Sequence, residues 1–132
     1  MQSINNPPQN FPTVYLLQEP TSDKDLSSAA KQGRIVPIIG AYEKPAMHVL
    51  PTMNKLYEVL QNYNPEQDMI CFAGGDPMVQ FLAGIVIERL GFDEVTYLIW
   101  NRDRDQSGAR SGGYYLPKKG KLFYNPIGAE NE

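Results

Sequence analysis

The chain has 132 residues, a length typical of one domain, with a hydrophobic fraction of 42%, a charged fraction of 20% and a net charge of −3. A membrane span is not predicted, because the longest apolar run, Phe81 to Ile87, covers about a third of the roughly 20 residues required. The N-terminus lacks a signal-peptide pattern, and the single cysteine, Cys71, cannot form an internal disulfide. These features predict a cytoplasmic protein.

Charge is unevenly distributed along the chain. The segment from Asn101 to Lys121 carries a net charge of +4, so the remainder carries −7. The pattern indicates a net-acidic domain with one basic segment, which bears on the choice of partner.

The first part of the chain predicts an arm, a strand and a short helix. Residues 1–12 are rich in proline and asparagine, which favours an extended arm outside the core. The β-branched and aromatic run Thr13–Leu17 predicts a strand. Asp23 or Asp25 is expected to cap a short helix through Ala29–Lys31, with Gly33 as its end.

The next two elements are a strand at residues 35–39 and a helix from about Pro51 to the break at Asn64-Pro65. Pro37 removes a backbone donor, so this strand is expected at a sheet edge or at a bulge. Residues at helical spacing predict the buried face of the helix: Met53, Leu56, Tyr57, Leu60 and Tyr63.

A continuous apolar strand is predicted at residues 69–73, as expected when both of its faces are covered. The helix from Pro77 to Leu90 is apolar nearly all round, which predicts a central and deeply buried position. A fourth strand follows at residues 95–100.

The fold class predicted by this alternation is α/β, with a mostly parallel, three-layer sheet of about four to five strands, Rossmann-like or flavodoxin-like. The residues from Tyr114 to Tyr124 predict a C-terminal hairpin or an antiparallel edge. We expect a single domain at residues 13–125 between the N-terminal arm and a short tail at 126–132.

A ligand-binding corner is predicted at the carboxyl ends of the strands, where open parallel sheets bind ligands. Two glycines let a ligand approach the backbone, and the following helix offers N–H groups and a positive dipole end. The expected ligand-binding residues are Glu19, Gly74, Gly75, Asp76 and Arg102.

Asp76 has two interpretations. In the structural one, Gly74 to Pro77 form a tight turn, an N-cap and a first-turn proline. In the functional one, the Asp76 carboxylate accepts a hydrogen bond from a ligand hydroxyl or amine, because its negative charge opposes a phosphate.

No catalytic constellation is recognised. The chain has no P-loop and no dinucleotide-binding glycine motif after a strand, and His48 has no partner for a zinc site. Cys71 lies within a strand and is interpreted as a small core residue. We therefore assign no catalytic residue, cofactor or metal, and an enzymatic role is less favoured than a binding role.

The basic segment has two interpretations, a solvated surface hairpin or a contact surface for an acidic protein or a phosphate backbone. Two tyrosines among the cations offer stacking or hot-spot area. The expected partner-binding residues are Arg104, Arg110, Tyr114, Tyr115, Lys118, Lys119 and Lys121.

Two resemblances arise at these motifs. Gly74-Gly75-Asp76-Pro77 resembles the turn with which tetrapyrrole methylases help bind S-adenosylmethionine, but the match covers four residues and the activity is not carried over. The wider layout over residues 13–117 is similar to small α/β proteins of tailed bacteriophages. The features that carry it are residues 25–30, Gly75-Asp76-Pro77, Trp100 with Arg102, and Tyr115-Leu116-Pro117.

The phage resemblance implies a protein that acts in the cytoplasm of an infected bacterium, and it implies no chemistry. The leading hypothesis is a binding protein that engages an acidic phage or host macromolecule, away from membranes, through the basic segment and the strand ends. The alternatives are a nucleotide-binding or small-anion-binding enzyme or sensor using the Gly74–Asp76 turn, and a virion structural component. A homo-oligomer is compatible with each.

Overall fold

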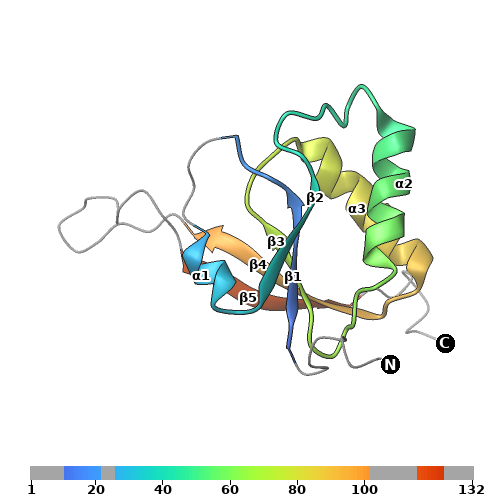
Figure 1. Ribbon diagram of the computed structural model, residues 1–132. Coiled ribbons are helices and arrows are strands. Elements are labelled where there is room, and N and C mark those ends of the chain that lie inside the picture. Colours follow the sequence, from blue (N-terminus) through green and yellow to red (C-terminus); the bar gives the residue numbers. More distant parts are fainter. Residues whose placement is uncertain (1–10, 22–25, 102–115, 124–132) are drawn as a thin grey trace, which may run out of the picture.

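A five-stranded sheet forms the centre of the molecule in the computed structural model, which describes residues 11–21, 26–101 and 116–123 (Figure 1). The strand order is β2-β1-β3-β4-β5. The elements in chain order are β1 (Thr13–Gln18), α1 (Ser27–Ala30), β2 (Arg34–Ile39), α2 (Val49–Leu60), β3 (Met69–Phe72), α3 (Pro77–Leu90), β4 (Glu94–Asn101) and β5 (Leu116–Phe123).

The first four strands of the sheet are parallel and β5 is antiparallel to β4. This order is the flavodoxin-type order of doubly wound sheets, with the last strand reversed. The predicted α/β fold with an antiparallel edge is confirmed. Lys118 to Lys121 lie within one continuous strand.

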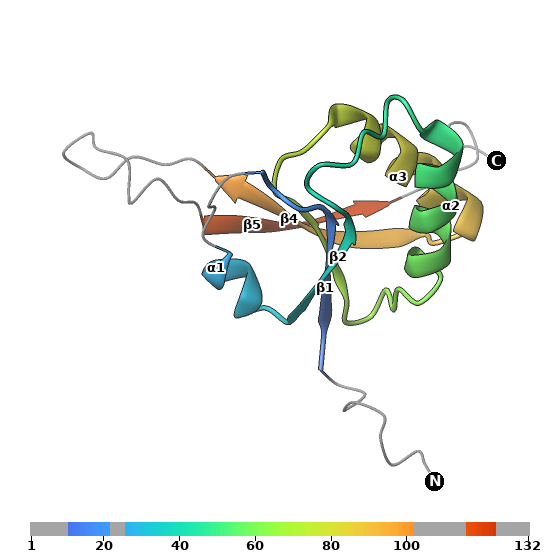
Figure 2. The same ribbon diagram turned by 45° about the horizontal axis from the view of Figure 1, so that its top comes forward.

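The sheet has helices on both faces, with α2 and α3 on one side and the short α1 on the other (Figures 1 and 2). Strand residues alternate between these two layers because successive side chains point to opposite faces. On β1, Tyr15 and Leu17 pack with α2 and α3, whereas Val14 and Leu16 pack with Ala29 of α1. The buried thiol of Cys71 belongs to this second cluster, as predicted.

The edge position of β2 agrees with the prediction made from Pro37. The predicted cap of α1 is wrong, because Leu26 occupies the N-cap position and makes no side-chain cap. Gly33 lies two residues beyond the C-cap Lys31, and its role is close packing. A Cβ at Gly33 would meet the Pro12 carbonyl oxygen at 2.5 Å.

Two helix faces differ from their predicted orientation. In α2 the buried side chains are Thr52, Leu56 and Leu60, while Tyr57 is 45% exposed. In α3, Leu82 is buried, Ile85 is partly buried, and Phe81 is 66% exposed. The central and deeply buried position predicted for α3 is therefore wrong. The helix covers one face of the sheet beside α2 and turns its other side to solvent.

Candidate functional site

The strand order reverses between β1 and β3, because the chain leaves β1 toward β2 on one side and returns to β3 on the other. Doubly wound sheets bind ligands in the crevice beyond the carboxyl ends at this point. Here those ends are Gln18 and Glu19 after β1, and the turn from Ala73 to Asp76 after β3. Both α2 and α3 also begin at this edge of the sheet (Figure 1).

Gly74 and Gly75 both have positive φ angles, +105° and +99°. This backbone conformation is available to glycine without a steric penalty. At Gly75 a Cβ would also meet the Gln18 Oε1 atom at 2.6 Å. The predicted glycine turn is therefore present. At Gly75 the space that a Cβ would need is occupied by the Gln18 side chain and not by a ligand.

Gln18 joins three segments at this edge. Its Oε1 atom accepts a hydrogen bond from the Asp76 backbone N–H at 2.7 Å. Its Nε2 group donates to the carbonyl oxygens of Gly40 at 3.0 Å and Glu43 at 3.3 Å. The side chain is 3% exposed. Gln18 thereby ties the end of β1 to the segment after β2 and to the start of α3.

Asp76 is the N-cap of α3, as the sequence predicts. Its Oδ1 atom accepts from the Met78 N–H at 3.0 Å, and its carbonyl oxygen accepts from the Val79 N–H at 2.9 Å. Pro77, the first residue of the helix, has no N–H. The N–H groups of Asp76, Met78 and Val79 therefore all have acceptors within the protein.

The remaining predicted ligand residues are Glu19 and Arg102. Glu19 is exposed, and its backbone N–H donates to the Ile39 carbonyl oxygen at 3.0 Å. Arg102 lies outside the described residues. The structure thus brings Gly74, Gly75 and Asp76 together with Gln18, a strand-end residue absent from the predicted set.

Of the predicted partner-binding residues, Lys118, Lys119 and Lys121 lie on β5. Arg104, Arg110, Tyr114 and Tyr115 lie outside the described residues. Lys119 is paired opposite Leu98 and Lys121 opposite Thr96, and both lysines are exposed. Residues two apart on a strand share a face, so these two ammonium groups belong to one surface.

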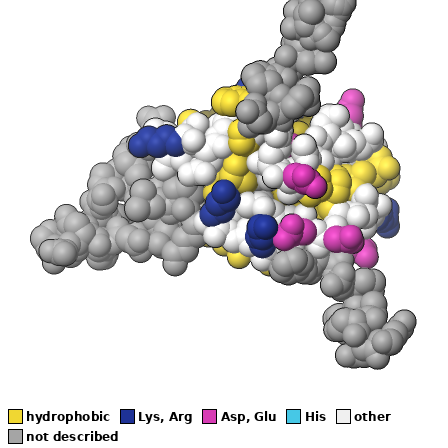
Figure 3. All heavy atoms as spheres, turned by 90° about the horizontal axis from the view of Figure 1, so that it is seen from below, with side chains coloured by type: hydrophobic (Ala, Val, Ile, Leu, Met, Phe, Trp, Pro, Cys, Tyr) yellow, Lys and Arg dark blue, Asp and Glu magenta, His cyan; other side chains and the backbone are white. Residues whose placement is uncertain are grey.

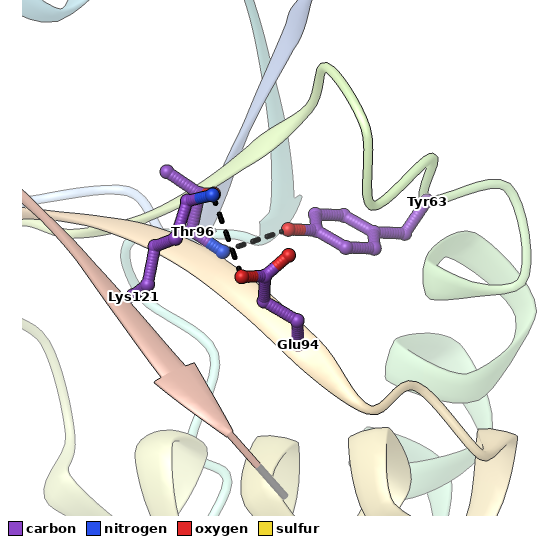
Figure 4. A network of polar contacts seen from close by, with 4 residues as sticks. All are labelled: Tyr63, Glu94, Thr96 and Lys121. Carbon is purple, nitrogen blue, oxygen red and sulfur yellow. Dashed lines mark hydrogen bonds and ion pairs between the residues drawn. The ribbon is translucent and has the colours of Figure 1, made fainter.

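This surface also carries acidic groups. The Lys121 Nζ atom lies 3.4 Å from the Glu94 Oε2 atom, and the two side chains are 60% and 33% exposed (Figure 4). Both residues line an open hollow of about 660 Å³, whose walls also include Lys119, Glu66 and Asp68. Cationic and acidic side chains accordingly lie side by side on the lower face of the molecule (Figure 3).

Two polar groups organise this region: the Asp68 carboxylate, which the sequence did not single out, and the hydroxyl of Tyr63, which was predicted only as part of a buried helix face. The buried Asp68 accepts from the Thr13 N–H at 2.9 Å and from the Asn64 N–H at 2.8 Å. The Tyr63 hydroxyl accepts from the Thr96 N–H at 3.0 Å (Figure 4). Thr13 lies 55 residues from Asp68 and Thr96 lies 33 residues from Tyr63, so no local pattern signals these two contacts.

The phenol of Tyr15 has a shifted pKa. Burial of the phenol, and secondly the nearby negative charge of Asp68, raise the pKa of Tyr15 above its ordinary value, against a smaller lowering by Arg34. Within the described ranges, no group of three or more potential ligands could hold a metal ion. None of the helices in the described part of the chain has the length and hydrophobicity of a bilayer span.

Fold and site together define a small doubly wound α/β protein in which the Gln18 side chain bridges segments that meet at the switch point. Residues 12–107 match the family described as Phage Pam3 gp32-like protein. This match covers more than half of the chain, which therefore belongs to that family. No curated protein and no solved structure matches the chain. The predicted phage origin is confirmed, and the family description states no activity.

Proposed function

We propose that this phage protein is a binding protein without catalytic activity, and that it engages an acidic macromolecule through β5 and the basic residues that precede it. The observation that carries the proposal is the pair Lys119 and Lys121, exposed on one face of the outermost strand of the described sheet. Both belong to the segment from Asn101 to Lys121, which has a net charge of +4 in a chain that is otherwise acidic.

The ion pair between Lys121 and Glu94 is compatible with this role. Exposed ion pairs contribute only about 0 to 1 kcal/mol, so an acidic partner can replace Glu94 at little cost. The edge of β5 adds a second element of recognition, because an edge strand can pair with an extended segment of a partner. Leu122, 40% exposed, offers apolar contact area on the opposite face of the same strand.

The test begins with a pull-down of partners from an infected lysate, followed by affinity measurements against salt. If the partner is duplex DNA, two or three phosphate contacts give a log–log slope of about −2 to −3. The variant Lys118→Gln, Lys119→Gln, Lys121→Gln should flatten this slope. Glu94→Gln should strengthen binding, because it releases Lys121 from its carboxylate partner.

A charge-matched control separates the local surface from net charge. Lys31→Gln, Arg34→Gln, Arg89→Gln removes the same number of cations at exposed positions outside β5 and should leave the slope nearly unchanged. The proposal fails if the β5 variant binds every recovered partner as tightly as the wild type at low salt. Competition with DNA or RNA then distinguishes a nucleic acid from an acidic protein.

A second candidate function is small-ligand binding at the Gly74–Asp76 turn, with Glu19 and Arg102 as the further ligand residues predicted from the sequence. The position of this turn at the switch point favours it. Since Asn caps a helix about as well as Asp, Asp76→Asn tests the carboxylate separately from the cap. Loss of a binding event in Asp76→Asn, with the free energy of unfolding unchanged, would establish a ligand role.

A further inference from the structure

A second hollow lies at the start of α2, separate from β5 and from the Gly74–Asp76 turn. Its volume is about 510 Å³, and it is formed by the segment after β2 and the first two turns of α2. The residues that line it are Tyr42, Glu43, Lys44, His48, Pro51, Thr52 and Lys55. Among these residues only His48 stood out in the sequence as a possible ligand, and then only for zinc.

Two cationic side chains, Lys44 and Lys55, line this hollow. Lys44 and Lys55 are exposed, and neither forms a salt bridge within the described part of the chain. Glu43 is the one acid of the lining, and its Oε2 atom accepts a hydrogen bond from the Gly40 N–H at 3.1 Å. The two lysines therefore outnumber the carboxylate.

Thr52 supplies the observation that points to a ligand. Thr52 is 5% exposed, and its backbone N–H donates to the His48 carbonyl oxygen at 3.0 Å. Its hydroxyl makes no hydrogen bond to any part of the chain that the structure describes. Buried hydroxyl groups are normally paired, because an unpaired one costs stability. This one lies on the wall of the hollow, between His48 and Lys55 along the helix.

The start of α2 reinforces the positive potential. Its N-cap residue, His48, makes no side-chain cap, so the first-turn N–H groups of Val49 and Leu50 have no capping acceptor. A twelve-residue helix carries about half a positive charge at this end. His48 and Pro51, which flank these two residues in sequence, both line the hollow.

We propose that this hollow binds the phosphate group of a small phosphorylated molecule. Lys44 and Lys55 neutralise the phosphate charge, and the Thr52 hydroxyl donates a hydrogen bond to one of its oxygens. The ring of Tyr42, 81% exposed at the rim, provides a face for the rest of the ligand. This site is independent of the acidic-partner surface on β5.

Titration calorimetry of the full chain with inorganic phosphate, AMP and adenosine tests the proposal. Phosphate and AMP should both bind and adenosine should not. Tighter binding of AMP than of phosphate identifies a nucleotide-type ligand, and equal binding identifies the phosphate alone as the recognised group. Absence of binding by both phosphate and AMP at millimolar concentration, or equal binding of adenosine and AMP, overturns the proposal.

Variants then locate the site. Lys44→Gln, Lys55→Gln should weaken binding of phosphate and AMP by roughly tenfold or more, the scale of lost charge-assisted hydrogen bonds. The matched control Lys31→Gln, Arg89→Gln has the same net charge and should bind like the wild type. Equal affinity in the Lys44/Lys55 variant and its control would contradict the assignment.

Thr52→Val gives a readout that a merely structural threonine does not. Valine keeps the shape of the side chain and removes the hydroxyl, so the urea midpoint should rise while phosphate affinity falls. A fall in the midpoint would show that the hydroxyl has a structural partner, and it would remove the observation on which the site depends.

Discussion

The two long helices begin at the same edge of the sheet and satisfy their first turns in opposite ways (Figure 1). At α3 the Asp76 carboxylate caps the helix, and Gln18 occupies the Asp76 N–H. At α2 no side chain caps the helix, and a cation-lined hollow lies beside it. A glycine-rich turn before a helix is thus no sufficient sign of an anion site, because the protein's own groups can fill it.

The largest effect on stability is expected near the start of α3, where Gln18 bonds to three backbone groups. Gln18→Ala removes the acceptor of the Asp76 N–H and the donors to two carbonyl oxygens, which should cost about 2 to 3 kcal/mol of unfolding free energy. Urea denaturation measures it, with Gln80→Ala on the exposed side of α3 as the matched control. A cost for Gln18→Ala no greater than that of the control would show that the Gln18 hydrogen bonds do not stabilise the protein.

A smaller effect is expected at Asp76. Asp76→Ala should lower the unfolding free energy by roughly 1 kcal/mol, because the Met78 N–H loses its capping acceptor. Asp76→Asn should cost much less, since asparagine caps as well. Equal losses in the two variants, measured by thermal or urea unfolding, would mean that the charge of Asp76 and not its capping bond stabilises the helix.

At the start of α2, adding a cap should raise the unfolding free energy instead of lowering it. His48→Asp places a carboxylate at the uncapped start of α2 and should raise the unfolding free energy by about 0.5 to 1 kcal/mol. The same change should weaken phosphate binding, because a negative charge enters the lining of the hollow. His48→Ala is the control for the loss of imidazole. A gain of the same size in His48→Ala would remove capping as the cause.

The smallest effect at neutral pH is expected at Tyr15, in the core below both helix ends. The pKa of Tyr15 is raised in the folded protein, so its contribution is fully present below the ordinary value of 10.0 and is lost as the pH rises through that of the folded state. Tyr15→Phe should therefore unfold less readily at alkaline pH than the wild type. Parallel pH profiles of the urea midpoint for the two proteins would contradict this.

The same contrast explains which parts of the site the sequence could predict. The cap at Asp76 was predictable because its contacts reach only two or three residues along the chain, and Asp-Pro after a strand and two glycines is a local signal. Gln18 bonds to groups 22, 25 and 58 residues away, so its role depends on the strand order. The predicted set contained its exposed neighbour, Glu19, instead.

The sequence by itself determined the α/β class and the boundaries of most elements to within a few residues, and it limited the proline-containing strand β2 to a sheet edge or a bulge. These features depend on local properties: the missing backbone donor of proline, the conformations open to glycine and the spacing of hydrophobic residues. They can therefore be predicted from one sequence. Only the tertiary structure decided which helix faces are buried. Tyr57 and Phe81 are apolar and exposed, whereas Thr52 is polar and buried. Burial depends on what packs against each face, and hydrophobic period alone does not contain that information.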